Sequence, residues 1–155
     1  MTENANDAST FRAWSLSRQK CIVVTDDGGK KAPKCTGTGD DSEKKSQFTM
    51  VLNTANPIFD ENSVHLVFTE GDQKYTLVPD LESDTIVSAN YEESSKHIGA
   101  FVKDSFGQGP TYALRVARSQ KCIAANKDGF LSLRPFDRVY PHPDTIFFLS
   151  KVSAE

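Results

Sequence analysis

Histidine, cysteine and serine are the residue types in this chain that could bind a metal or act as a nucleophile. His65, His97 and His142 lie far apart in the sequence and show neither HxxxH nor HExxH spacing. The three cysteines include no CxxC pair, and no GxSxG motif is present to hold a nucleophilic serine on a sharp turn. The sequence therefore predicts no metal centre, no cofactor and no enzymatic activity.

The cysteines Cys21, Cys35 and Cys122 are odd in number, which does not indicate a closed disulfide framework. We expect reduced thiols, although one disulfide with a thiol left over stays open. Cys21 and Cys122 follow the same Gln-Lys dipeptide. A packing role would explain both positions at once.

Length and charge narrow the class of protein. A chain of 155 residues is typical of one domain, and its hydrophobic share of 37% is that of a globular protein. The net charge of −3 argues against nucleic acid as a partner. No stretch approaches the ~20 apolar residues of a membrane span, and the first ten residues contain no apolar run that would form a signal peptide. We expect a monomer that does not insert into membranes.

An internal repeat is the strongest signal in the sequence. The string Gln-Lys-Cys-Ile at residue 19 recurs at residue 120, and Gln-Lys-Tyr-Thr at residue 73 lies between them, in steps of 54 and 47 residues. Phe48, Phe101 and Phe148 keep nearly the same period, with steps of 53 and 47. Alternating apolar residues precede each copy, as at residues 64–68 and 112–116, and this alternation is typical of strands.

Three repeats of about 50 residues, each with roughly four short strands, predict a closed all-β fold of about 12 strands. We interpret this pattern as a β-trefoil with repeats at about residues 10–60, 61–109 and 110–152, preceded by a flexible tail at residues 1–9. His65 alternates with apolar neighbours and is expected to face solvent. The predicted inward-facing set is Ala13 or Trp14, Leu16, Ile22, Val24, Phe48, Met50, Leu66, Phe68, Leu77, Ile86, Phe101, Leu114, Val116, Ile123, Leu131, Leu133, Ile146 and Phe148.

Three segments carry a resemblance to a known family. The Phe-Arg-Ala-Trp start of residues 11–20, the Ala-Phe-Val-Lys-Asp-Ser segment at 100–105 and the closing segment 144–149 resemble strands of the interleukin-1 family of cytokines. The family's Glu-Ser and Pro-Gly-Trp elements are missing from residues 112–123. The chain is thus similar to a divergent member.

The resemblance implies a secreted ligand that acts in inflammation or immunity, as an agonist or an antagonist. Such a ligand binds a cell-surface receptor with an immunoglobulin-like ectodomain and an accessory receptor chain. It is released by an unconventional, leaderless route from a cytoplasmic pool. By position, the primary receptor contacts map to Trp14, Arg18, Gln19, Lys34 and Thr36.

A second group of contacts is expected for the accessory receptor, at Lys103, Asp104, Arg138 and His142. Asp7, followed by Ala8, is a candidate processing site.

Other binding functions stay open. A protease inhibitor could present Lys34 or Arg138 from a rigid loop, and the string from Lys121 to Gly129 is compatible with an intracellular scaffold of the fascin kind. A lectin-like module is a further alternative, although a ricin-type lectin should carry Gln-x-Trp in each repeat, and Trp14 is the one tryptophan.

Overall fold

The computed structural model describes residues 10–27, 30–39, 44–52, 63–70, 72–91, 100–105 and 109–152. Twelve strands and two short 3-10 helices make up this part of the chain. In order they are β1 (Thr10–Ser15), β2 (Cys21–Asp27), β3 (Lys30–Gly37), η2 (Lys44–Ser46), β4 (Phe48–Leu52), β5 (Val64–Glu70), β6 (Gln73–Asp80), β7 (Thr85–Asn90), β8 (Phe101–Ser105), β9 (Thr111–Val116), β10 (Lys121–Ala125), β11 (Leu131–Pro135), η4 (Pro143–Thr145) and β12 (Phe147–Lys151).

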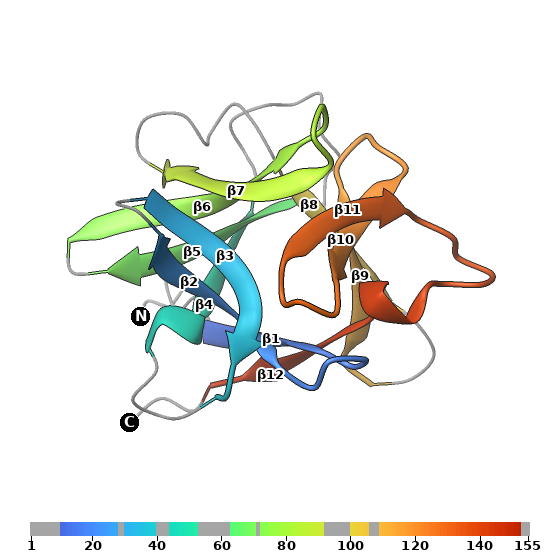
Figure 1. The fold of residues 1–155 in the computed structure, drawn as a ribbon, viewed down its shortest axis with the longest axis horizontal. Coiled ribbons are helices and arrows are strands. Elements are labelled where there is room, and N and C mark those ends of the chain that lie inside the picture. Colours follow the sequence, from blue (N-terminus) through green and yellow to red (C-terminus); the bar gives the residue numbers. More distant parts are fainter. Residues whose placement is uncertain are drawn as a thin grey trace, which may run out of the picture.

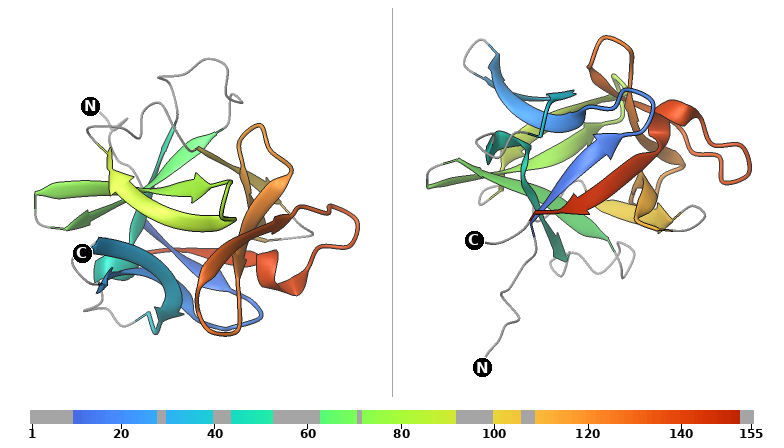
Figure 2. Two further views of the ribbon diagram at one scale, coloured as in Figure 1. Left: turned by 45° about the horizontal axis from the view of Figure 1, so that its top comes forward. Right: turned by 90° about the horizontal axis from the view of Figure 1, so that it is seen from below.

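All strand pairs are antiparallel and belong to one sheet. The first and last strands lie side by side (Figures 1 and 2), with Ala13 opposite Leu149. β1 also pairs with β4, and β4 with β5, so both ends of the chain are joined to its middle. The predicted all-β class is confirmed.

The predicted β-trefoil is wrong, because nine of the twelve strands close into one barrel. The closed path runs β1–β4–β5–β6–β7–β11–β10–β9–β12 and returns to β1. The β6–β7 and β10–β11 hairpins are joined within it by the pair Ser132↔Thr85, whereas the β2–β3 hairpin lies outside it. A sequence repeat predicts strand period and number, but contacts between hairpins decide how the sheet closes.

The core fills the inside of the barrel with apolar side chains. Ile22, Leu77, Phe101, Ile123 and Phe147 are at most 1% exposed. Burial of each such side chain stabilises the fold by about 1.5–3 kcal/mol. A residual cavity beside Leu77 has only about 20 Å³, which is too small for a ligand.

Three predicted orientations were wrong. In β12, Phe147 and Leu149 are buried and Phe148 is 36% exposed, so the strand is one residue out of the predicted register. Four consecutive apolar residues, 146–149, are compatible with either register, because a one-residue slip exchanges the two faces. Leu16 is 48% exposed because it lies beyond the end of β1, and His65 is 2% exposed because β5 is covered on both faces.

Candidate functional site

A surface cleft of about 300 Å³ lies in the described part of the chain. Three segments that are distant in sequence form it: the β1–β2 turn, the end of β3, and the β10–β11 turn. Its lining residues are Ser17, Arg18, Lys20, Cys35, Thr36, Lys127, Asp128 and Gly129. We call it the turn cleft, and its volume is at the lower end of the range for small-molecule sites.

The β1–β2 turn forms the first wall. Its backbone is closed by Ser15 N–H donating to the Lys20 carbonyl (2.8 Å) and Gln19 N–H donating to the Ser15 carbonyl (2.7 Å). Gln19 takes a left-handed conformation, with φ of 59°. The Ser15 hydroxyl accepts a hydrogen bond from Arg18 N–H at 3.1 Å, which fixes the backbone from which Arg18 projects.

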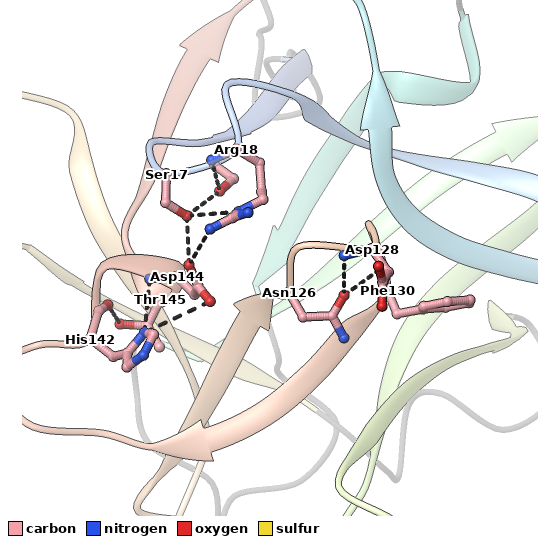
Figure 3. A network of polar contacts seen from close by, with 9 residues as sticks. Ser17, Arg18, Asn126, Asp128, Phe130, His142, Asp144 and Thr145 are labelled. Carbon is pink, nitrogen blue, oxygen red and sulfur yellow. Dashed lines mark hydrogen bonds and ion pairs between the residues drawn. The ribbon is translucent and has the colours of Figure 1, made fainter.

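A polar network behind this wall holds the Arg18 side chain (Figure 3). Asp144 Oδ1 accepts hydrogen bonds from Ser17 Oγ (2.8 Å) and Arg18 Nη2 (3.1 Å). Asp144 N–H in turn donates to His142 Nδ1, the N-cap of η4, at 3.1 Å. Burial opposes ionisation of Asp144, but the hydrogen bonds from Ser17 and Arg18 and the Arg18 charge outweigh it, so the pKa of Asp144 lies below its ordinary value of 3.8.

This network contains serine, histidine and aspartate but is not arranged as a catalytic triad. A triad requires the histidine to accept the serine proton and the aspartate to orient the histidine. Here Ser17 donates directly to Asp144, and His142 Nδ1 accepts from a backbone amide. The network supports a wall of the cleft and does not activate a nucleophile.

The β10–β11 turn forms the opposite wall, and hydrogen bonds within the turn hold its backbone (Figure 3). Asn126 Oδ1 accepts from Asp128 N–H (3.1 Å) and Phe130 N–H (3.0 Å), an arrangement typical of Asn in turns. Gly129 has φ of +87°, and a β-carbon there would lie 2.7 Å from Thr36 Cγ2. Glycine is therefore required both by the backbone conformation and by the close approach of β3.

β3 connects the two walls through its backbone. Cys35 N–H donates to the Gly129 carbonyl at 2.7 Å, and Lys34 forms a bridge with Phe130. Phe130 is 53% exposed, and the Lys34 ammonium lies 5.4 Å from the centre of its ring. The turn thus exposes an aromatic ring and a cation next to the cleft.

The Cys35 thiol at the floor of the cleft is not a reactive group. Its Sγ donates to the Lys20 carbonyl at 3.2 Å, and the residue is 2% exposed. Burial raises the pKa of Cys35 to about 11, although the charges of Arg18 and Lys20 act in the opposite direction. The thiol stays protonated at neutral pH and is a poor nucleophile.

The structure brings most of the predicted primary contacts to this face. Arg18 and Thr36 line the cleft, Gln19 is exposed in the turn, and Lys34 lies beside Phe130. Trp14 differs, because its Nε1 donates to Ser150 Oγ at 3.0 Å and its ring packs where a β-carbon of Gly39 would be. Half-buried contacts of this kind give Trp14 a structural role.

The predicted accessory contacts fall into two clusters. Asp104 accepts from Arg115 Nε at 2.7 Å and from Arg138 Nη2 at 3.4 Å, and the Lys103 ammonium stands 5.1 Å from the Tyr112 ring. His142 belongs instead to the Asp144 network, and no contact connects it to Arg138 in the described residues. The candidate processing site at Asp7 lies outside the described residues.

Sequence reasoning missed half of the cleft. It considered the string from Lys121 to Gly129 only as part of a possible scaffold, and it did not select Ser17, Lys20 or Asp144. The string Asn-Lys-Asp-Gly at residues 126–129 was the available signal, because these residue types stabilise turns with positive φ. The fold places β3 and the β1–β2 turn next to this hairpin, and no local sequence pattern indicates this arrangement.

The described residues contain no group of three or more His, Cys, Asp or Glu side chains placed to hold a metal ion, and His97 lies outside them. Within the same residues, neither of the short helices has the length and apolar character that a membrane crossing requires.

Comparison with known proteins gives similarity at the level of fold. No family model matches the sequence, and no curated protein matches it either. Among solved structures, the crystal structure of Cry35Ab1 is similar to 97% of this chain, with a TM-score of 0.71 and 9% identity; this chain spans 37% of that one. The structure of SeviL bound to asialo-GM1 saccharide is also similar, with a TM-score of 0.63 and 7% identity; the match covers 94% of this chain and 99% of that chain.

Proposed function

We propose that this chain is a non-catalytic recognition protein that binds a saccharide in the turn cleft. The observation that carries the proposal is the cleft itself: a polar concavity in which hydroxyl, carboxylate and ammonium groups from three segments converge. Saccharides are bound by such hydrogen-bonding groups on a scaffold that does not have to rearrange. The fold similarity to a lectin is consistent with the proposal.

Rigidity of both walls supports this function. Arg18 is held by Asp144, and the β10–β11 turn is held by Asn126 and by the Gly129–Cys35 hydrogen bond. Thr36 and Asp128 are exposed, and no hydrogen bond or ion pair to either side chain is found within the described residues. Their oxygens are therefore available to a ligand hydroxyl.

The site proposed here differs from that of a ricin-type lectin. The Gln-x-Trp motif expected of such lectins is absent, and Trp14 is engaged with Ser150 outside the cleft lining. The turn cleft combines two turns with one strand end. We accordingly propose one saccharide site at the turn cleft and no threefold set.

Binding to an array of saccharides, followed by titration calorimetry of the hits, tests the proposal. Asp128→Asn removes the carboxylate while it keeps the side-chain shape, and we expect a loss of affinity of about tenfold, which corresponds to about 1.4 kcal/mol. Asp72→Asn is the matched control, because Asp72 is an exposed carboxylate in the β5–β6 turn. Absence of binding to every saccharide, or equal losses in both variants, would contradict the proposal.

A ligand for a cell-surface receptor is the second candidate function. The observation in its favour is that Arg18 and Thr36, two of the five residues that the interleukin-1 resemblance predicts as receptor contacts, line the turn cleft. Arginine is also among the residue types that most often anchor interfaces. Under this proposal the chain is secreted and binds an immunoglobulin-like ectodomain.

Surface-captured binding to a panel of interleukin-1-type receptor ectodomains tests this second candidate. Gln19→Ala should weaken saturable binding, whereas Gln120→Ala, at the corresponding position of the later repeat, should not. Binding that both variants weaken equally, or no binding at all, would count against a receptor ligand.

A further inference from the structure

The turn cleft is positively charged on a protein whose net charge is −3. Three cationic side chains, Arg18, Lys20 and Lys127, line it, together with a single carboxylate, that of Asp128. Counted from these four groups, the lining carries a formal charge of +2 (three positive, one negative). Such a local excess of one sign in a concave site attracts ligands of the opposite sign.

Two of these cations have no ion-pair partner in the described part of the chain. Lys20 and Lys127 are exposed, and no carboxylate lies within ion-pairing distance of either ammonium group there. Arg18 is partly neutralised, since its Nη2 is shared with Asp144. The positive charge of the cleft therefore comes mainly from two lysines that belong to opposite walls.

Two other lysines near hairpins of this protein are neutralised. Lys121, which corresponds to Lys20 in the repeat, lies 2.5 Å from Asp84, and Lys31 is paired with both Asp26 and Glu70. These ion pairs show that the fold supplies carboxylates to lysines elsewhere. Lysines left without such partners on both sides of one cleft provide a site for an external anion.

Building on the saccharide-binding function proposed above, we infer that the ligand of the turn cleft is an acidic saccharide. Its sulfate or carboxylate group lies between Lys20 and Lys127, and its hydroxyl groups reach Thr36 and Asp128. A cleft of about 300 Å³ is larger than a single inorganic anion needs, so the sugar ring contributes to the fit. Binding by this mechanism weakens as salt screens the lysine charges.

Matched pairs of saccharides that differ only in the acidic group provide the test. A sialylated oligosaccharide is compared with its asialo form, and a sulfated glycosaminoglycan fragment with its desulfated form, by titration calorimetry at two salt concentrations. We expect at least one acidic member to bind about fivefold or more tightly than its neutral partner, as two exposed ion pairs allow. Inorganic sulfate at matched ionic strength serves as the competitor.

The double variant Lys20→Gln, Lys127→Gln should abolish this preference for the acidic member of each pair. Lys74→Gln, Lys151→Gln has the same change in net charge at exposed positions outside the cleft, and it should keep the preference. Thermal unfolding confirms that both variants are folded.

Each outcome separates the two proposals. Equal binding of the neutral and acidic members would overturn the acidic-ligand inference and leave saccharide binding intact. No binding of any member would overturn both. Competition by inorganic sulfate as strong as that by the saccharide, or an equal loss in the control variant, would also overturn the inference, because it would show a simple anion site or general attraction.

Discussion

The β1–β2 and β9–β10 turns both lead into the string Gln-Lys-Cys-Ile, yet the protein uses them differently. The left-handed residue is Gln19 (φ 59°) in the first turn and Arg118 (φ 63°) in the second, two positions earlier relative to the string. Lys20 is exposed at the turn cleft, whereas Lys121 pairs with Asp84. The same four residues therefore give two backbones and two electrostatic environments.

The partner of Lys121 explains this difference. Asp84 precedes β7, and its carbonyl accepts from Leu133 N–H (2.9 Å) on β11, next to the pair that closes the barrel between these strands. The β2–β3 hairpin lies outside the closed path. The repeated lysine is thus held in an ion pair at the β9–β10 turn and is exposed at the β1–β2 turn.

The largest loss of stability is expected from a substitution in the β10–β11 turn, which faces the β1–β2 turn across the cleft. Gly129→Ala should lower the free energy of unfolding by about 2 kcal/mol, because alanine is strained at φ of +87° and its β-carbon would meet Thr36. Urea denaturation measures the loss. Gly109→Ala is the matched control: it shares a positive φ of 81° but nothing lies within 4 Å, so its cost should be about half as large. Equal costs would show that contact with Thr36 is unimportant.

The polar network behind the first turn comes next. Asp144→Ala leaves Arg18 and Ser17 without their acceptor and should cost about 1–2 kcal/mol of stability. Asp84→Asn removes the exposed ion pair with Lys121 and keeps a residue type that tolerates the φ of 57° at this position, so it should cost less than about 1 kcal/mol. Chemical denaturation of both variants compares the turns. A larger loss in Asp84→Asn would reverse our view of which turn depends on its carboxylate.

The loss of thermal stability at low pH should depend on the Asp144 carboxylate behind the β1–β2 turn. Because the pKa of Asp144 is lowered in the folded state, its stabilising effect is fully present above the unfolded pKa of about 3.9 and is lost as pH falls through the folded value. Asp144→Asn should therefore flatten the decline in thermal stability as the pH falls below about 4. An unchanged slope in this variant would assign the decline to other carboxylates.

The smallest effect on stability is expected from the two equivalent lysines. Lys20→Gln should leave unfolding unchanged, and Lys121→Gln should cost about 0.5 kcal/mol through its half-exposed ion pair. Their effects on ligand affinity should run the other way, with Lys20→Gln weakening the binding of an acidic saccharide. Scanning calorimetry and ligand titration of the same two proteins provide both comparisons.

Local sequence patterns predicted the strands and much of the core correctly. Alternation correctly placed Leu66, Leu114 and Ile123 inside. Alternation failed where it is ambiguous, at the apolar run 146–149, and where a strand is buried on both faces, as around His65.

The closed path of the sheet and the turn cleft could not be predicted in the same way. Both depend on pairs that are distant in sequence, such as Ser132 with Thr85 and Cys35 with Gly129. Arg18 and Thr36 were selected through a family resemblance, while Lys127 and Asp128 have no local feature that distinguishes them from ordinary turn residues. Their significance arises only when the fold brings them opposite Lys20.

The three buried thiols have a consequence for where this protein can exist. Cys21, Cys35 and Cys122 are at most 2% exposed and form no disulfide with one another, and burial raises the pKa of Cys35 and Cys122 to about 11. Glutathione and oxidants act on accessible thiolates, which these residues do not offer in the native state. The thiols of the folded chain should accordingly stay reduced under oxidising as well as reducing conditions.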